Sequence, residues 1–162
     1  MSHARSFAVK FGAAALLLMA SLVGSSGALA GPAPAAIAEL TTFAGQHQPP
    51  VGAFTASGIP GCPSGSFSDQ VVSFNQTGTR VVIDRTYACN GGETLTARVG
   101  LHLGAIDAAG LQTVDGSWRI VGSNGTLAGS GSLTGFNSGC APAGTALGEC
   151  ATGVGTVTVA LH

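Results

Sequence analysis

The sequence predicts an all-β protein, a small Gly-rich antiparallel β-barrel with two disulfides, and a β-sandwich is the alternative. Short segments alternate apolar and polar residues with period two and are separated by turn residues. From residue 31 onward no long window has the 3.6-residue period of an amphipathic helix. Glycines recur every two to four residues at 122–139, and glycines inside strands mark bulges or barrel corners, so this segment favours the barrel.

Residues 1–30 are predicted to be a cleaved secretory signal peptide. Arg5 and Lys10 precede an apolar run at 13–23, which is shorter than the ~20 residues that cross a bilayer as a helix. Ala28-Leu29-Ala30 fits the small-x-small rule for cleavage. We therefore expect a mature chain without a membrane span, secreted, or periplasmic where an outer membrane is present.

Residues 31–50 are predicted to be a flexible arm. The segment is rich in Ala and Pro and then polar, its only helix-like turn is at 35–40, and Pro49 and Pro50 end any helix. Residues 51–162 then form the single β-barrel domain.

The clearest predicted strand covers residues 94–103. Its apolar positions alternate with polar ones and are Leu95, Ala97, Val99, Leu101 and Leu103. Further strands are predicted at 67–74, 80–87, 117–121 and 154–161, with a weaker one at 51–57. Turn residues are found at 75–78, 90–92, 115–116 and 124–125. The apolar positions of 94–103 either face the core, which we favour, or form an outer patch covered in a homo-oligomer.

The four cysteines predict two disulfides, because an even number in an exported chain usually pairs. Of the three possible pairings we favour Cys62 with Cys89, which brackets one hairpin, and Cys140 with Cys150, which closes a short loop. Zinc is the alternative, but no two cysteines have the spacing of a zinc knuckle. We predict no metal and no cofactor.

The charge balance excludes several classes of partner. Residues 31–162 hold four Arg, no Lys and seven acidic residues, a net formal charge of −3. A nucleic-acid binder needs a basic stripe, and a polybasic membrane anchor needs clustered Lys or Arg. We therefore expect no nucleic-acid partner.

Three segments carry a family resemblance: residues 62–67 (Cys-Pro-Ser-Gly-Ser-Phe), 85–92 (Arg-Thr-Tyr-Ala-Cys-Asn-Gly-Gly) and 118–131, which begins Trp-Arg-Ile-Val-Gly-Ser-Asn-Gly-Thr. They resemble secreted bacterial proteins that are similar to the allene oxide cyclase and dirigent β-barrels, in which a Val-x-Gly-Gly-Thr-Gly run precedes a Gly-containing strand. Here Ser123-Asn124 replaces the expected Gly-Thr. The resemblance implies a barrel over about 62–135. It transfers no function to this chain, because no catalytic residue of either family matches a position here and a shared fold alone does not carry function.

Candidate ligand-pocket residues lie on the predicted strands. Thr96, Arg98 and His102 share one strand face. If that face points into the barrel, they form a small-molecule site together with Trp118. The alternative, which we favour, is a solvated face on which Asp84 pairs with Arg98 across strands and Trp118 packs in the core.

A second strand places its residues on two faces. Arg80, Asp84 and Thr86 share one face of 80–87, and the other face carries Val81, Ile83, Arg85 and Tyr87.

No catalytic residue is predicted, because the chain has no Gly-x-Ser-x-Gly elbow and its cysteines are expected to be oxidised. The expected function is a non-catalytic binding or interaction module for a small hydrophobic ligand or an extracellular protein. One alternative is a cyclase- or isomerase-like enzyme, or a carrier, that holds a small hydrophobic molecule near Arg98 and His102. Another is a secreted protease inhibitor that presents the loop between Cys140 and Cys150.

Overall fold

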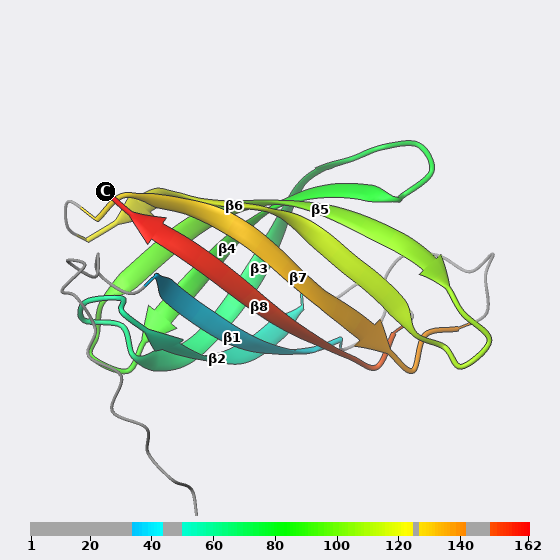
Figure 1. The fold of residues 1–162 in the computed structure, drawn as a ribbon, viewed down its shortest axis with the longest axis horizontal. Helices are drawn as coiled ribbons and strands as arrows, with labels where there is room; N and C mark the ends of the chain where they lie inside the picture. The colour runs from blue at the N-terminus through cyan, green and yellow to red at the C-terminus, as the bar shows by residue number, and fades with distance from the viewer. Residues whose placement is uncertain (1–33, 44–49, 125–126, 142–149) are drawn as a thin grey trace, which may run out of the picture. The chain divides into compact units, whose positions relative to one another are not determined.

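Eight antiparallel strands close into a barrel in which each strand pairs with the next along the chain and the last pairs with the first (Figure 1). The structure is a computed structural model that describes residues 34–43, 50–124, 127–141 and 150–162. The strands are β1 (Ala35–Thr42), β2 (Val51–Ser57), β3 (Ser64–Phe74), β4 (Arg80–Cys89), β5 (Thr94–Ile106), β6 (Gln112–Ser123), β7 (Gly129–Ser138) and β8 (Thr152–Leu161). The predicted all-β antiparallel barrel is confirmed.

The alternation of apolar and polar residues located most strands correctly. β2 has the predicted bounds, and the predictions at 80–87 and 154–161 each fall inside a slightly longer strand. The apolar residues of the predicted strand 94–103 face inward: Leu95, Ala97, Val99 and Leu103 are buried. The alternative of an outer patch on β5 is therefore wrong.

The predicted arm is wrong for residues 35–42, which form β1. Its residues alternate between buried and more exposed, with Ile37 and Glu39 pointing inward. Alanine favours helices, but this segment pairs along its length with both β2 and β8, and that tertiary pairing overrides the local preference. The predicted signal peptide and the rest of the arm lie outside the described residues, except Pro34, Phe43 and Pro50.

The predicted turn at 115–116 is also wrong, because both residues lie inside β6. A Cβ on Gly116 would lie 2.1 Å from the carbonyl oxygen of Gly100 on β5, so this glycine allows close strand approach and does not mark a turn. The turns at 75–78 and 90–92 are present, closed by hydrogen bonds from Gly78 N to Asn75 O and from Gly92 N to Cys89 O, 2.9 Å each.

β7 was not predicted as a strand of its own, and its glycines explain why. Gly131 and Gly135 lie on the inward face of β7, where apolar side chains would have indicated a strand. A Cβ on either glycine would lie within about 2 Å of a carbonyl oxygen of β8, so no side chain fits there. Of the predicted turn at 124–125, only Asn124 is described.

The core fills the inside of the barrel with aromatic and β-branched side chains. Its largest fully buried residues are Trp118, Tyr87, Ile37, Val99, Val157 and Val159. The Tyr87 ring lies between Phe54, with ring centroids 5.0 Å apart, and Trp118, at 6.3 Å.

Both predicted disulfides are confirmed. Cys62 bonds to Cys89, and Cys140 bonds to Cys150. Two disulfides indicate an oxidising, extracellular-type environment for the folded chain.

Candidate functional site

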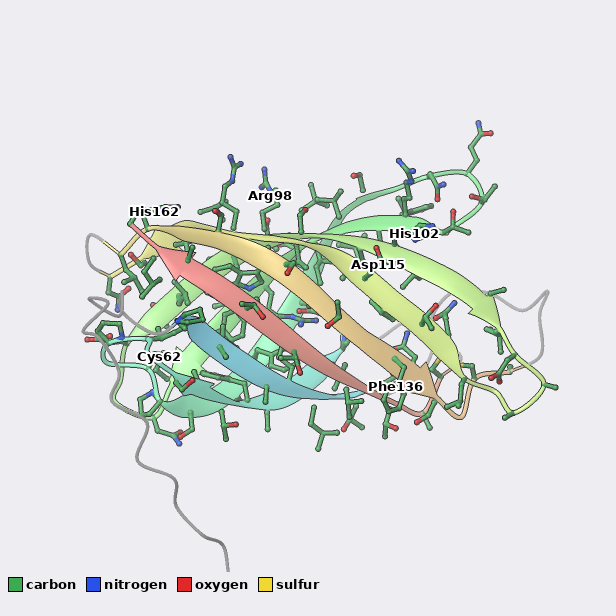
Figure 2. The ribbon with its side chains drawn as sticks, in the orientation of Figure 1. Cys62, Arg98, His102, Asp115, Phe136 and His162 are labelled. Atoms are coloured by element: carbon green, nitrogen blue, oxygen red, sulfur yellow. A yellow bond between two sulfur atoms is a disulfide. The ribbon has the colours of Figure 1, made fainter. Side chains whose placement is uncertain are left out.

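The predicted site residues on β5 lie on the outside of the barrel. The Arg98 side chain is 46% exposed and points away from the barrel (Figure 2). It donates two hydrogen bonds to Asp84, from Nε to Oδ1 and from Nη2 to Oδ2, each 2.9 Å. The hydrogen bond from Arg98 lowers the pKa of Asp84. The predicted surface ion pair is therefore confirmed.

The other three candidates do not join Arg98 in a pocket. The His102 side chain is 54% exposed, with Nδ1 3.2 Å from Oδ1 of Asp115. Thr96 lies on the same outer face, its hydroxyl 3.4 Å from that of Thr86. Trp118 is 1% exposed and lies inside the barrel. The candidate pocket is not formed, because side-chain alternation puts Thr96, Arg98 and His102 on the opposite side of the barrel wall from Trp118. The favoured interpretation, a solvated face with Trp118 in the core, is confirmed.

The barrel interior contains a polar cluster that was not predicted. Arg85 donates from Nε to Oδ1 and from Nη2 to Oδ2 of Asp69, each 2.6 Å, and from Nη1 to Oε2 of Glu39. The Tyr87 hydroxyl donates to the second Glu39 oxygen and accepts a hydrogen bond of 2.9 Å from Trp118 Nε1. The cluster thus joins β1, β3, β4 and β6.

Burial and charge act together on the cluster. Burial raises the pKa of Glu39, which the nearby Arg85 charge offsets only in part. Burial also raises the pKa of Tyr87, and the Glu39 carboxylate raises it further. For Arg85, burial lowers the pKa, but the hydrogen bonds to Asp69 and the charges of both acids outweigh it, and its net pKa is raised. Arg85 is therefore a permanent cation between two acids.

The cluster is saturated by its own members. Every buried side-chain nitrogen and oxygen of the described residues has a hydrogen-bond partner. The Arg85 guanidinium also lies 4.3 Å from the centre of the Phe67 ring, which covers one of its faces. The arrangement fixes four strands relative to one another and leaves no polar group unpaired for a ligand.

The sequence contained an indication that Arg85 is buried. Arg85 was predicted to share one strand face with Val81, Ile83 and Tyr87, and in the structure that face points inward. An arginine on an apolar face needs a buried partner. Its partner Glu39 could not be identified, because 31–50 was interpreted as an arm.

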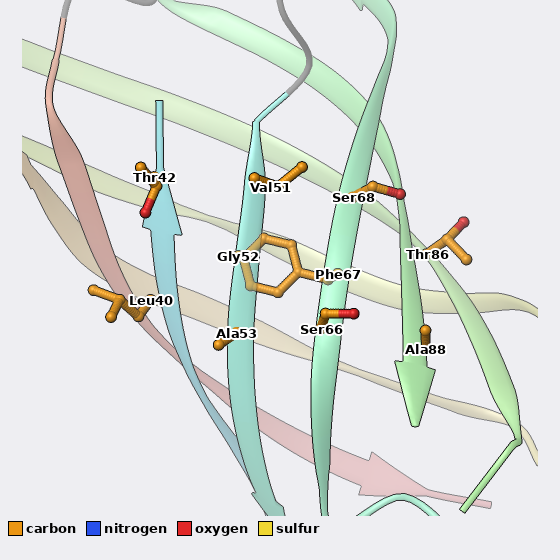
Figure 3. Close-up of a pocket in the computed structure, with 10 residues that line it drawn as sticks. All are labelled: Leu40, Thr42, Val51, Gly52, Ala53, Ser66, Phe67, Ser68, Thr86 and Ala88. Atoms are coloured by element: carbon orange, nitrogen blue, oxygen red, sulfur yellow. The ribbon is translucent and has the colours of Figure 1, made fainter. Parts of the chain in front are cut away.

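A groove lies on the outer surface of β1 to β4 (Figure 3). Its volume is about 540 Å³. Its walls and floor are formed by Leu40, Thr42, Val51, Gly52, Ala53, Ser66, Phe67, Ser68, Thr86 and Ala88. The Phe67 ring lies against Gly52, where a Cβ would be 2.2 Å from Cζ of the ring.

The groove has a distinct chemical character. None of its ten lining residues is charged. Leu40 and Val51 are each about half exposed and give it apolar walls, while Thr42, Ser66 and Ser68 add hydroxyl groups. A site of this kind matches a neutral ligand that combines an apolar part with a hydrogen-bonding group.

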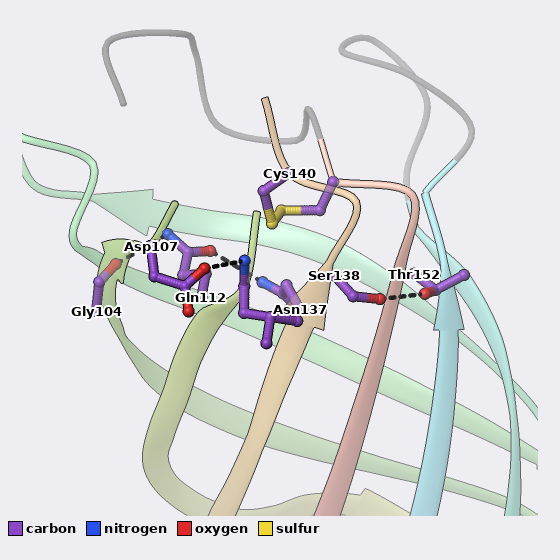
Figure 4. Close-up of a disulfide and its surroundings, with 9 residues drawn as sticks. Gly104, Asp107, Gln112, Asn137, Ser138, Cys140 and Thr152 are labelled. Atoms are coloured by element: carbon purple, nitrogen blue, oxygen red, sulfur yellow. Dashed lines mark hydrogen bonds between the residues drawn. A yellow bond between two sulfur atoms is a disulfide. The ribbon is translucent and has the colours of Figure 1, made fainter. Parts of the chain in front are cut away.

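The Cys140–Cys150 disulfide lies beside a side-chain network at one end of the barrel (Figure 4). Asn137 Nδ2 donates to Gln112 Oε1 at 3.0 Å, and Gln112 Nε2 donates to the Gly104 carbonyl at 3.1 Å. Residues 142–149, which carry the predicted inhibitory loop, lie outside the described residues.

Within the described ranges, no group of three or more His, Cys, Asp or Glu residues is placed to hold a metal ion. No helix in that part of the chain is long and apolar enough to cross a membrane. No protein-family model, curated protein or solved structure matches the chain.

Proposed function

We propose that the protein is an exported, disulfide-stabilised binding module that takes a small neutral hydrophobic ligand in the outer groove. The observation that carries the proposal is the uncharged hollow over β1 to β4, lined on the outside by the exposed Leu40 and Val51 and by Ser and Thr hydroxyl groups. A charged ligand would lose hydration there without gaining a counter-charge. The barrel acts as a rigid support for this surface.

The outer position of the groove favours a binding module over an enzyme that works inside the barrel. The enzyme hypothesis depended on Arg98 and His102 facing a cavity, and both side chains point to solvent. The interior polar groups are bonded to one another. No residue pair in the groove provides an acid and a base, because its polar side chains are all Ser or Thr.

The test uses 1-octanol as a neutral probe and octanoate as its charged counterpart, with binding mapped by amide chemical shifts. We expect octanol to shift residues of the groove and octanoate to shift them less. Ala53→Trp should fill the groove and abolish the octanol shifts. Ala160→Trp places the same side chain at an exposed position on β8 and should leave them unchanged.

Two results would contradict the proposal. Octanol shifts that persist in Ala53→Trp would place the probe elsewhere. Equal or stronger shifts with octanoate would show that the groove does not select a neutral ligand.

A further inference from the structure

The distal half of β3 leaves the barrel wall and has one strand edge without a described partner. β2 pairs with β3 only at Ser64–Ser68, whereas β4 pairs with β3 as far as Phe74. Pro50 accepts a last hydrogen bond from Asp69 N, and as a proline it has no N–H to return. The β3–β4 hairpin therefore projects from the wall (Figure 1), and within the described residues no strand pairs with the outer edge of 70–74.

This edge carries exposed apolar side chains on the face that elsewhere forms the core. Val71 pairs with Ile83 and Phe74 pairs with Val81, and both partners face the barrel interior. Directly paired residues lie on the same face of a sheet. Val71 is nevertheless 54% exposed and Phe74 68% exposed, and among the described residues no strand continues the barrel wall beside them.

We propose that this edge pairs with the same edge of a second copy of the chain, so that two hairpins form one four-stranded antiparallel sheet. In this sheet the two copies would be related by a two-fold axis perpendicular to the sheet, and such a rotation does not exchange the two faces of the sheet. The pairing would thus gather Val71 and Phe74 of both copies on one face, where they cover one another. It would also supply the hydrogen-bonding groups that an unpaired edge needs.

Charge and twist favour a second copy over another extended partner. Residues 70–74 are Gln-Val-Val-Ser-Phe, so two copies bring no like charges together. The register shift between Val71 and Ser73 marks a β-bulge, which increases local twist and hinders pairing with a flat strand. The same bulged strand in a second copy has the matching twist.

The pairing should be weak and depend on concentration, because about five residues from each chain take part, far fewer than the ~20–30 a side of a standard interface. Sedimentation velocity from low micromolar to millimolar protein should show a reversible monomer–dimer equilibrium. In the same samples, amide exchange at 70–74 should slow as concentration rises, whereas the β5–β6 turn should not change.

Charged variants test which surface is used. Val71→Lys and Phe74→Lys place like charges across the two-fold axis at exposed positions, and each should weaken the dimer by about tenfold or more. Val121→Lys is the matched control, because Val121 is an exposed apolar residue on β6 that lies away from the hairpin. It should leave the equilibrium unchanged.

A wild-type protein that stays monomeric throughout this range would overturn the proposal. So would a dimer that Val121→Lys weakens as much as Phe74→Lys. Neither result depends on octanol binding in the groove, so the two proposals can fail separately.

Discussion

Asp69 on β3 and Arg85 on β4 are direct partners in the strand register, and their side chains form two parallel hydrogen bonds of 2.6 Å inside the barrel. The same guanidinium bonds to Glu39 on β1. The one cation thus compensates two buried acids from different strands.

Replacing Arg85 should destabilise the fold strongly. Arg85→Met leaves Asp69 and Glu39 buried without a counter-charge, and we expect a loss of about 3–5 kcal/mol in the free energy of unfolding, measured by urea denaturation at neutral pH. The matched control, Arg98→Met, breaks an exposed ion pair and should have a much smaller effect. Equal losses in the two variants would contradict the structural role of the cluster.

Glu39 should make stability fall as pH rises. Burial raises the pKa of folded Glu39 above its ordinary value of 4.5. As pH rises above 4.5, the unfolded chain loses this proton first, so the folded state binds more protons and loses stability. The measurement is the unfolding free energy of the wild type and of Glu39→Gln as a function of pH. We expect the wild-type value to fall relative to the variant between pH 4.5 and the raised pKa of Glu39. An increase over that range would show that the carboxylate is stabilised inside the barrel.

The two disulfides should contribute unequally to stability. The chain-entropy relation gives about 3.5 kcal/mol for the sequence separation of 27 between Cys62 and Cys89, and about 2.7 kcal/mol for the separation of 10 between Cys140 and Cys150. Cys62 and Cys89 are also buried in the core. Thermal unfolding of the two double Cys→Ala variants should therefore show the larger decrease for the Cys62–Cys89 pair. The reverse order would mean that the loop at Cys140 matters more than its length predicts.

Gly52 should resist substitution. In Gly52→Ala the new Cβ would lie 2.2 Å from the Phe67 ring and 2.5 Å from the Leu40 carbonyl oxygen, so the ring or the backbone must move. We expect a loss of about 1–3 kcal/mol by chemical denaturation. Gly122→Ala is the control, because its nearest neighbour, Thr96 Cβ, would be 3.7 Å away. If both variants were equally stable, the ring would not be held against β2.

The alternation of apolar and polar residues predicted the barrel because the outer and inner faces of most strands differ in polarity. It succeeded for β5, where Leu95, Ala97 and Val99 alternate with polar residues. It failed where the inward residues are not apolar, as at Glu39 on β1 and Gly135 on β7. Such positions are explained only by contacts with other strands: Glu39 bonds to Arg85 of β4, and Gly135 leaves room for the backbone of β8.

The site was harder to predict than the fold. Alternation assigned Thr96, Arg98 and His102 to one face correctly but could not decide which side of the wall that face occupies. The groove brings together residues from four strands, such as Leu40 of β1 and Ala88 of β4. A local sequence pattern contains none of these relationships.

The pairing of β1 with β8 closes the barrel, and we expect it to form late in folding. The contact between Ala35 and Val159 closes the longest loop of any strand pair in the chain, and contacts so distant in sequence form slowly because their loop-closure entropy is highest. Until β8 docks, β1 and β7 each present an open edge. A chain truncated before Thr152 would therefore have two strands available for intermolecular pairing and should aggregate during refolding.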